Sequence, residues 1–241
     1  MQTSEVFRLV HDAESELQMA ADPARAVSEK AYQKSDLEFW GCNSATVRRV
    51  GKQLSKSLPA DSPETLWQIV ELLWNRGVWE LRSTAIALLE LKTGLLTTSD
   101  LPRIRLLVIE SNGWAHNDWI GCNVLGRLVQ SQPSALDTMD QWAVDDNLWV
   151  RRVAMQSLLL GLRKGDLAQW TRFVNYAEPL VTKKDFWTRK VIGWILRETS
   201  KKNPAQVHEF LFANRERVSG LTLREGAKYL GAAARADLGL T

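Results

Sequence analysis

Apolar residues recur along most of the chain at steps of three and four positions. The pattern is clearest in PETLWQIVELLWN (63–75), RSTAIALLELK (82–92) and RRVAMQSLLLGL (151–162). Such steps place the apolar side chains on one face of an α-helix, whereas a half-buried strand alternates them with polar residues. Stretches with strand-like alternation are scarce, so the pattern predicts an all-α protein.

The prolines agree with this interpretation. Pro63 follows Ser62 and Pro204 follows Asn203, and no proline interrupts a periodic segment. Serine and asparagine are favoured caps at a helix N-terminus, and proline is favoured at the first helical position. We therefore predict helices that begin at Pro63 and Pro204, each capped by the preceding side chain.

Four tryptophans open comparable segments at a nearly constant spacing. Trp79, Trp114, Trp149 and Trp187 are separated by 35, 35 and 38 residues. Periods of this length are typical of HEAT-like helical solenoids, in which each helical hairpin buries its apolar face against its neighbours. The sequence predicts a single HEAT-like repeat domain over residues 1–241, with Trp79, Trp149 and Trp187 serving as packing residues.

One repeat carries a charge that the others lack. Four positions after each tryptophan lie Ser83, Asp118, Val153 and Val191, respectively. Three positions after each tryptophan lie Arg82, Asn117, Arg152 and Lys190. A carboxylate beside large apolar rings is costly unless a charged or polar group meets it. The inner helices of a solenoid line a concave groove, so Asp118 suggests a ligand there. A structural salt bridge is the alternative.

Charge is distributed unevenly along the chain. From Asn147 onward, 17 Lys and Arg face 8 Asp and Glu, a balance of +9, whereas the first 146 residues have a balance of −6. A basic half suits an anionic partner such as nucleic acid, and an ordinary solvated surface explains it equally well.

The remaining composition excludes several classes of protein. Cys42 and Cys122 lie far apart without CxxC spacing, which favours reduced thiols over a disulfide framework or a zinc site. The N-terminal segment mixes charges into its apolar residues, unlike a signal peptide or a membrane span. We expect a cytoplasmic monomer with no metal, cofactor or membrane partner.

Asp118 narrows the possible chemistry. The sequence has no partner carboxylate, Ser-His or Cys-His pair at suggestive spacing, and no glycine-rich phosphate loop. Cleavage of the N-glycosidic bond of an alkylated purine remains possible, because a base alkylated at N3 or N7 leaves neutral without a general acid. That reaction needs stabilisation of an oxocarbenium-like sugar, which a carboxylate and indole faces supply.

Several segments together resemble the AlkD-like DNA alkylation repair family of HEAT-like repeat glycosylases. They are GWAHNDWIGCNVLG (113–126), DDNLWVRRVA (145–154), DFWTRKVIGWILRETSKKNP (185–204) and, more weakly, AYQKSDLEFWG (31–41) and LTLREGAKYL (221–230). The resemblance covers most of the chain. It implies an all-α solenoid with a concave basic groove that binds double-stranded DNA containing alkylated purines.

The resemblance also implies the site residues. The family's catalytic carboxylate falls on Asp118, and its two DNA-facing tryptophans fall on Trp114 and Trp194. Its DNA-contacting residues fall on Arg152, Tyr32 and Arg197. Between Trp114 and Asp118 lies His116, for which a cap at the helix start is favoured over a contact with DNA.

By this resemblance, the chain is a monofunctional glycosylase of base excision repair that acts without flipping the base, unlike most glycosylases. N3-methyladenine and N7-methylguanine are representative substrates, and bulky adducts are possible ones. Two alternatives remain open: a non-catalytic HEAT-like DNA-binding or scaffold protein, and a protein-protein adaptor whose groove binds peptides.

Overall fold

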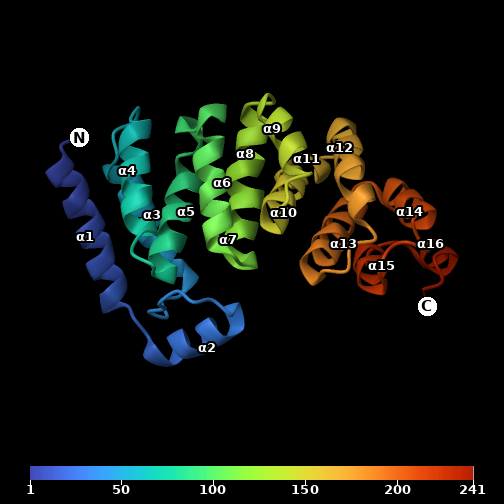
Figure 1. The fold of residues 1–241 in the computed structure, drawn as a ribbon, viewed down its shortest axis with the longest axis horizontal. Coiled ribbons are helices and arrows are strands. Elements are labelled where there is room, and N and C mark those ends of the chain that lie inside the picture. Colours follow the sequence, from blue (N-terminus) through green and yellow to red (C-terminus); the bar gives the residue numbers. More distant parts are fainter. Residues whose placement is uncertain (241) are drawn as a thin grey trace. The chain divides into compact units, whose positions relative to one another are not determined.

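A computed structural model of the chain describes residues 1–240, and their regular structure is helical (Figure 1). An isolated parallel bridge between Glu38 and Val78 is the one β-type pairing in this part of the chain. The α-helices are α1 (Thr3–Met19), α2 (Pro23–Gln33), α3 (Ser44–Ser57), α4 (Pro63–Trp74), α5 (Trp79–Leu91), α6 (Leu101–Ser111), α7 (Trp114–Trp119), α8 (Gly126–Ser131), α9 (Ala135–Trp142), α10 (Leu148–Ser157), α11 (Leu159–Leu162), α12 (Leu167–Ala177), α13 (Phe186–Ser200), α14 (Pro204–Ala213), α15 (Gly220–Gly226) and α16 (Ala232–Asp237). Short 3₁₀ turns occupy Thr93–Leu95, Thr98–Asp100 and Glu178–Leu180, and Ile120–Leu125 form a π-helical turn. The predicted all-α class is confirmed.

The predicted helix starts are confirmed, but their caps are not as expected. Helix α4 begins at Pro63 and α14 at Pro204, yet neither the Ser62 side chain nor the Asn203 side chain accepts a hydrogen bond from the helix backbone. The Ser62 hydroxyl instead donates to Thr65 Oγ1 at 2.6 Å. Side-chain caps do form at the N-termini of other helices, from Asp22, Asn43, Asn147, Asp166, Asp185 and Ser219. A residue type that can cap does so only where its backbone geometry allows it.

The helices form two compact units. Unit 1 contains residues Met1–Arg103 and Glu110–Ile120, and unit 2 contains Ile104–Ile109 and Gly121–Thr241. In unit 1, α1 packs on α3 and α4, both of these pack on α5, and α5 packs on α7. The unit 1 core is formed by fully buried side chains, among them Leu17, Leu66, Ile69, Leu73, Trp74, Leu81, Ile86 and Leu88. The expectation of one domain over 1–241 stays a prediction.

Unit 2 has its own helical core. Helices α8 and α9 pack on α10, α10 packs on α13, and α13 packs on α14 and α15. Its buried side chains include Phe173, Val191, Ile195, Leu196 and Leu211. Each unit therefore buries its apolar stripes by stacking helices, as the three- and four-residue periodicity predicts.

Polar contacts within each unit reproduce the period of the tryptophans. In unit 1, Trp74 Nε1 donates to Glu110, 36 positions on, at 2.6 Å. In unit 2, Lys190 donates to Glu225 and Arg163 donates to Glu198, both 35 positions on and both at 3.0 Å. Equivalent positions of successive repeats thus lie next to each other, which confirms the helical-repeat architecture.

The tryptophans that mark the repeats differ in burial. Trp149 is buried, whereas Trp79 and Trp187 are half-buried. All three pack against other rings, as predicted, but only Trp149 lies fully in the core. Trp79 stacks on Phe39 in unit 1, and Trp187 packs against Trp149 in unit 2. Within residues 1–240, no helix has both the length and the apolar character required to cross a bilayer.

Candidate active site

Helix α7 carries Trp114 and Asp118, and its opposite face is anchored in unit 1 by His116. This histidine is only 2% exposed, and its Nε2 lies 2.8 Å from the Ser83 hydroxyl of α5. Its ring stacks on the indole of Trp79, with centroids 3.8 Å apart. The favoured role as a cap is wrong, because the start of α7 has no side-chain cap. The ring instead packs inside unit 1.

The environment keeps the His116 ring neutral. Burial lowers its pKa from the ordinary value of 6.5 to about 3, and the nearby positive charge of Arg82 acts in the same direction. A neutral imidazole can be stacked in a protein interior without a counter-ion, whereas a charged one could not. At neutral pH, His116 is therefore an uncharged structural support for α7.

Trp119 gives α7 a second anchor. Its Nε1 donates to Glu90 of α5 at 2.5 Å. The guanidinium of Arg48 lies 4.4 Å from the centre of the Trp119 ring and donates to the same Glu90 carboxylate at 3.3 Å. Trp119, directly after Asp118, is therefore fixed by a hydrogen bond to Glu90 and a cation–π contact with Arg48, and these two partners are ion-paired with each other. These contacts limit the freedom of the short helix.

Trp114 and Asp118 occupy the other face of α7. Four positions apart, they are neighbours on one helical face, and both side chains are half-buried. Tyr32 of α2 lies edge-on to Trp114, with ring centroids 5.8 Å apart and planes at 90°. Tyr32 itself is 70% exposed. The structure thus brings together two of the residues that the resemblance assigned to DNA, from distant parts of the sequence.

A π-helical turn follows α7 directly and continues into α8. Helical hydrogen bonding widens over Ile120–Leu125, immediately after Trp119. In unit 2, Gly121 of this turn lies so close to α10 that an added Cβ would be 2.5 Å from the Gln156 side-chain oxygen. Glycine is needed here because of this close approach, and π-helical turns of this kind are frequent at functional sites. This glycine is the one feature of the local sequence that indicates the turn.

Three of the six predicted site residues lie in unit 2, and Arg152 on α10 is the most buried of them. It is 3% exposed. Its Nη1 donates to the backbone carbonyl of Trp187 at 2.9 Å, and its guanidinium lies 5.6 Å from the centre of the Trp187 ring. Arg152 thus fastens α10 to the first turn of α13, a structural role that sequence reasoning missed. Its contact with phosphate stays a prediction.

Trp194 lies on α13 and is half-buried. Four tryptophans of unit 1, Trp40, Trp67, Trp74 and Trp119, donate their indole N–H groups to Glu38, Asp100, Glu110 and Glu90, respectively. The indole N–H of Trp194, by contrast, donates to no acceptor among residues 1–240. Indole N–H groups that are buried usually have a hydrogen-bond acceptor. The half-buried Trp194 has none within these residues, so its N–H remains able to donate to a bound molecule.

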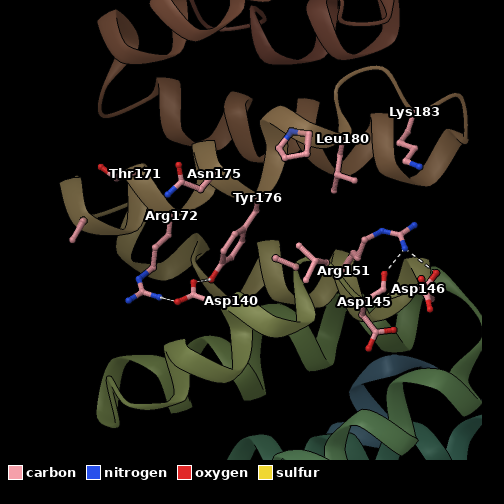
Figure 2. A pocket seen from close by; sticks show the side chains of 14 residues that line it. Asp140, Asp145, Asp146, Arg151, Thr171, Arg172, Asn175, Tyr176, Leu180 and Lys183 are labelled. Atoms are coloured by element: carbon pink, nitrogen blue, oxygen red, sulfur yellow. Dashed lines mark hydrogen bonds and ion pairs between the residues drawn. The ribbon is translucent and has the colours of Figure 1, made fainter.

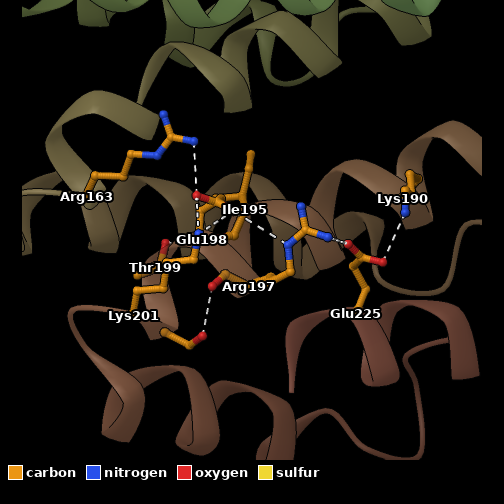
Figure 3. A network of polar contacts seen from close by, with 9 residues as sticks. Arg163, Lys190, Ile195, Arg197, Glu198, Thr199, Lys201 and Glu225 are labelled. Atoms are coloured by element: carbon orange, nitrogen blue, oxygen red, sulfur yellow. Dashed lines mark hydrogen bonds and ion pairs between the residues drawn. The ribbon is translucent and has the colours of Figure 1, made fainter. Parts of the chain in front are cut away.

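Arg197, one turn after Trp194, belongs to a network of ion pairs in unit 2 (Figure 3). Its guanidinium pairs with Glu225, and its Nε lies 3.5 Å from Glu198. Lys190 also pairs with Glu225, and Arg163 and Lys201 both pair with Glu198. The Arg197 side chain is 23% exposed. Its charge is therefore largely balanced within the protein, and a second contact with DNA from this residue stays a prediction.

The comparisons with known proteins agree on the family. The family model described as DNA alkylation repair enzyme matches residues 13–230. The chain belongs to the DNA alkylation repair enzyme family. The matched range contains all six predicted site residues, and the resemblance stated from the sequence is thereby confirmed. The protein is therefore a member of an enzyme family that acts in DNA alkylation repair.

Solved structures of similar fold support the assignment of architecture. A protein described as a predicted DNA alkylation repair enzyme from Enterococcus faecalis has a TM-score of 0.76 and 27% identity, over 88% of this chain and 97% of that chain. AlkD2 from Streptococcus mutans has a TM-score of 0.62 and 20% identity, over 86% and 98%. The protein smu.31 from Streptococcus mutans UA159 has the same score and identity, over 78% and 92%. No match is found among curated proteins.

A hollow of about 970 Å³ in unit 2 of this alkylation repair protein lies apart from the predicted site residues (Figure 2). None of the six lines it. Its charged groups are mostly paired with one another: Arg172 and Tyr176 bind Asp140, and Arg105 donates to Asp145 at 2.6 Å. We therefore interpret it as a solvated surface feature rather than as a site of alkylation repair.

Cys42 is a poor candidate for nucleophilic chemistry. Neither Cys42 nor Cys122 is part of a disulfide bond. Burial, followed by the charge of Glu80, raises the pKa of the Cys42 thiol to about 11. A thiol with such a pKa is a poor nucleophile at neutral pH. Within residues 1–240, no group of three His, Cys, Asp or Glu side chains is arranged to hold a metal ion.

Proposed function

We propose that this protein is a monofunctional DNA glycosylase that excises positively charged N3- or N7-alkylated purines from duplex DNA, as the first step of base excision repair. The observation that carries the proposal is the arrangement of α7. Its inner face is fixed by His116 and Trp119, and its other face presents Trp114 and Asp118 together. A carboxylate held rigidly beside an indole suits a cationic transition state.

In the proposed reaction, the bond between C1′ and the alkylated nitrogen breaks first. Its electron pair moves to the cationic base, which leaves neutral and needs no proton from the protein. The sugar becomes oxocarbenium-like, and the Asp118 carboxylate stabilises that charge by proximity. Water then adds to C1′ and loses a proton, which leaves an abasic site. No lysine takes part as a nucleophile, so the strand remains intact.

The other predicted residues have binding roles in this proposal. Trp114 and Trp194 flank the deoxyribose of the lesion, which requires that both reach one nucleotide when DNA is bound. Their partial exposure is consistent with this. Tyr32, with its exposed ring, contacts the duplex beside Trp114. Arg152 and Arg197 contribute positive charge to the DNA-binding surface, in addition to the protein contacts described above.

We further propose that the base stays in the duplex while the enzyme acts on the sugar in a concave basic groove. A damaged base that is not drawn into a pocket is not selected by its size, so bulky cationic adducts would be accepted along with methyl groups. Selectivity then comes from the charge of the lesion, since a cationic base is the better leaving group. Alkylated double-stranded DNA is the partner, and the protein acts as a monomer without a cofactor.

The direct test uses an end-labelled duplex that contains one N7-methylguanine. After incubation with the protein, alkali cleaves any abasic site and a gel resolves the product. The proposal predicts a cleaved strand only after alkali treatment. Cleavage without alkali would indicate lyase activity. An intact strand under all conditions, with DNA binding retained, would favour the non-catalytic DNA-binding alternative.

A further inference from the structure

Helix α2 is held in place without a hydrophobic anchor of its own. None of its residues is buried, and Val27 and Tyr32 are among its exposed side chains. A helix of this length is marginal in isolation and normally depends on packing of an apolar face. Something other than apolar packing must therefore hold α2 where Tyr32 contacts Trp114. The segment that follows α2 does so.

The segment Glu38–Cys42, here called the strap, lies between α2 and α3 in the sequence and contacts the start of both α2 and α5. The Glu38 N–H donates to the Gly77 carbonyl at 3.0 Å, and the Trp79 N–H donates to the Glu38 carbonyl at 2.8 Å. In the middle of the strap, the Trp40 carbonyl accepts from the Asp22 N–H, next to the first residue of α2, at 2.8 Å. The strap thus ties α2 to the N-terminus of α5.

One buried carboxylate organises the strap. Glu80 of α5 is 1% exposed and accepts three backbone hydrogen bonds. These come from the N–H groups of Trp40 at 3.0 Å, Gly41 at 2.6 Å and Cys42 at 3.2 Å. Hydrogen bonds to an ionised acceptor are about twice as strong as neutral ones, and three convergent donors satisfy a buried charge without a cation.

Gly41 makes this convergence possible. Its φ of +81° lies in the left-handed region, and an added Cβ would be 2.1 Å from the Asp22 carbonyl oxygen and 2.6 Å from the Ala26 nitrogen. Only glycine fits both the backbone conformation and this close approach to α2. The strap therefore contacts the first turn of α2 directly at the residue that also binds Glu80.

We propose that Glu80 is a positioning residue for the DNA-binding site: by fixing the strap it holds α2 in place and keeps Tyr32 edge-on to Trp114. This inference rests on the proposed function for the part that concerns DNA. Glu80 does not touch the substrate and acts through Trp40, Gly41 and Cys42. Whether Glu80 fixes the strap can be measured on the protein alone, without an activity assay.

The first measurement is amide hydrogen exchange of the full-length protein. In Glu80→Gln, the amide NH₂ must face at least one of the three N–H donors, so we expect exchange across residues 22–42 to quicken by about tenfold or more. Gly41→Ala should quicken the same residues without a change of charge. Glu110→Gln, which removes a carboxylate of the same unit that binds Trp74, is the matched control and should leave them unchanged.

The second measurement is a double-mutant cycle on the Kd for duplex DNA. Glu80→Gln should weaken binding by about threefold or more in the parent protein and by much less in a Tyr32→Ala background, since the two changes act on one contact. An equal effect in both backgrounds would overturn the inference, as would unchanged exchange in both strap variants. If the parent protein did not bind duplex DNA, the proposed function would be contradicted. Faster exchange in Glu80→Gln would in that case still show that Glu80 holds the strap in place.

Discussion

The ring of Tyr32 meets the indole of Trp114 edge-on, with centroids 5.8 Å apart. Tyr32 lies on α2, which has no buried side chain, whereas Trp114 lies on α7, which is anchored by His116 and Trp119. Edge-to-face aromatic pairs contribute roughly 0.5–1.5 kcal/mol beyond their buried area. The pair therefore links an exposed ring to the helix that carries Asp118, and its exposure makes Tyr32 a suitable position at which to test the proposed binding of DNA.

Replacement of Tyr32 by alanine should weaken binding to duplex DNA while the fold persists. The side chain is 70% exposed, so the free energy of unfolding should change by about 0.5–1.5 kcal/mol at most. Tyr32→Phe should retain most of the affinity, because it keeps the ring contact with Trp114. Fluorescence anisotropy with a labelled duplex measures the Kd. Phe7→Ala, a similarly exposed aromatic of unit 1, is the control, and an equal loss of affinity there would contradict this role for Tyr32.

Trp194→Phe and Trp67→Phe should have opposite effects on stability and activity. The Trp194 N–H has no acceptor within residues 1–240, so its removal should change the free energy of unfolding by less than about 1 kcal/mol. Trp67 donates to Asp100 at 2.7 Å, and its replacement should cost about 1–3 kcal/mol. Excision should fall only in Trp194→Phe. Denaturant titration and a single-turnover assay test the pair, and loss of excision in both variants alike would count against a ligand-binding role for Trp194.

Arg152→Ala should destabilise the protein by about 1–3 kcal/mol, because it removes the donor to the Trp187 carbonyl at a buried position. If Arg152 also binds a phosphate, the variant should flatten the salt dependence of DNA binding by about one unit of slope. Denaturant titration and Kd values measured over a range of salt separate these roles. An unchanged free energy of unfolding together with a reduced slope would show that its contact with DNA outweighs the structural contact seen here.

His116 should make the protein less stable at mildly acidic pH. Its folded-state pKa of about 3 lies below the unfolded value of 6.5, so the unfolded chain takes up a proton that the folded protein excludes. This contribution to stability is complete above pH 6.5 and is lost as the pH falls toward 3. Between pH 7 and 5, the parent should lose on the order of 1–2 kcal/mol more than His116→Gln, which can still hydrogen-bond Ser83. Identical pH dependence of the two unfolding free energies would show that His116 titrates normally.

The fold could be predicted from the sequence because its signals are local and repeated. Apolar spacing identifies the helices, and the tryptophan spacing matches the interval at which Lys190 meets Glu225. The site was predicted only as a set of positions, without their surroundings. Burial of Arg152 and the neutral stacking of His116 depend on which residues of other helices surround them, and periodicity does not specify those neighbours. The strap shows the same limit, since nothing local to Glu80 indicates that its partners lie about 40 positions earlier.

The central claim is that the Asp118 carboxylate stabilises the sugar cation, and Asp118→Asn tests it most directly. Asparagine keeps the size of the half-buried side chain, so the variant should fold and bind intact duplex DNA as the parent does. Excision of N7-methylguanine under single-turnover conditions should slow by on the order of a hundredfold or more, since a charge close to the transition state is lost. The effect should be smaller for more labile cationic lesions. A folded Asp118→Asn variant that binds DNA normally and releases the base at the parent rate would contradict the proposed mechanism.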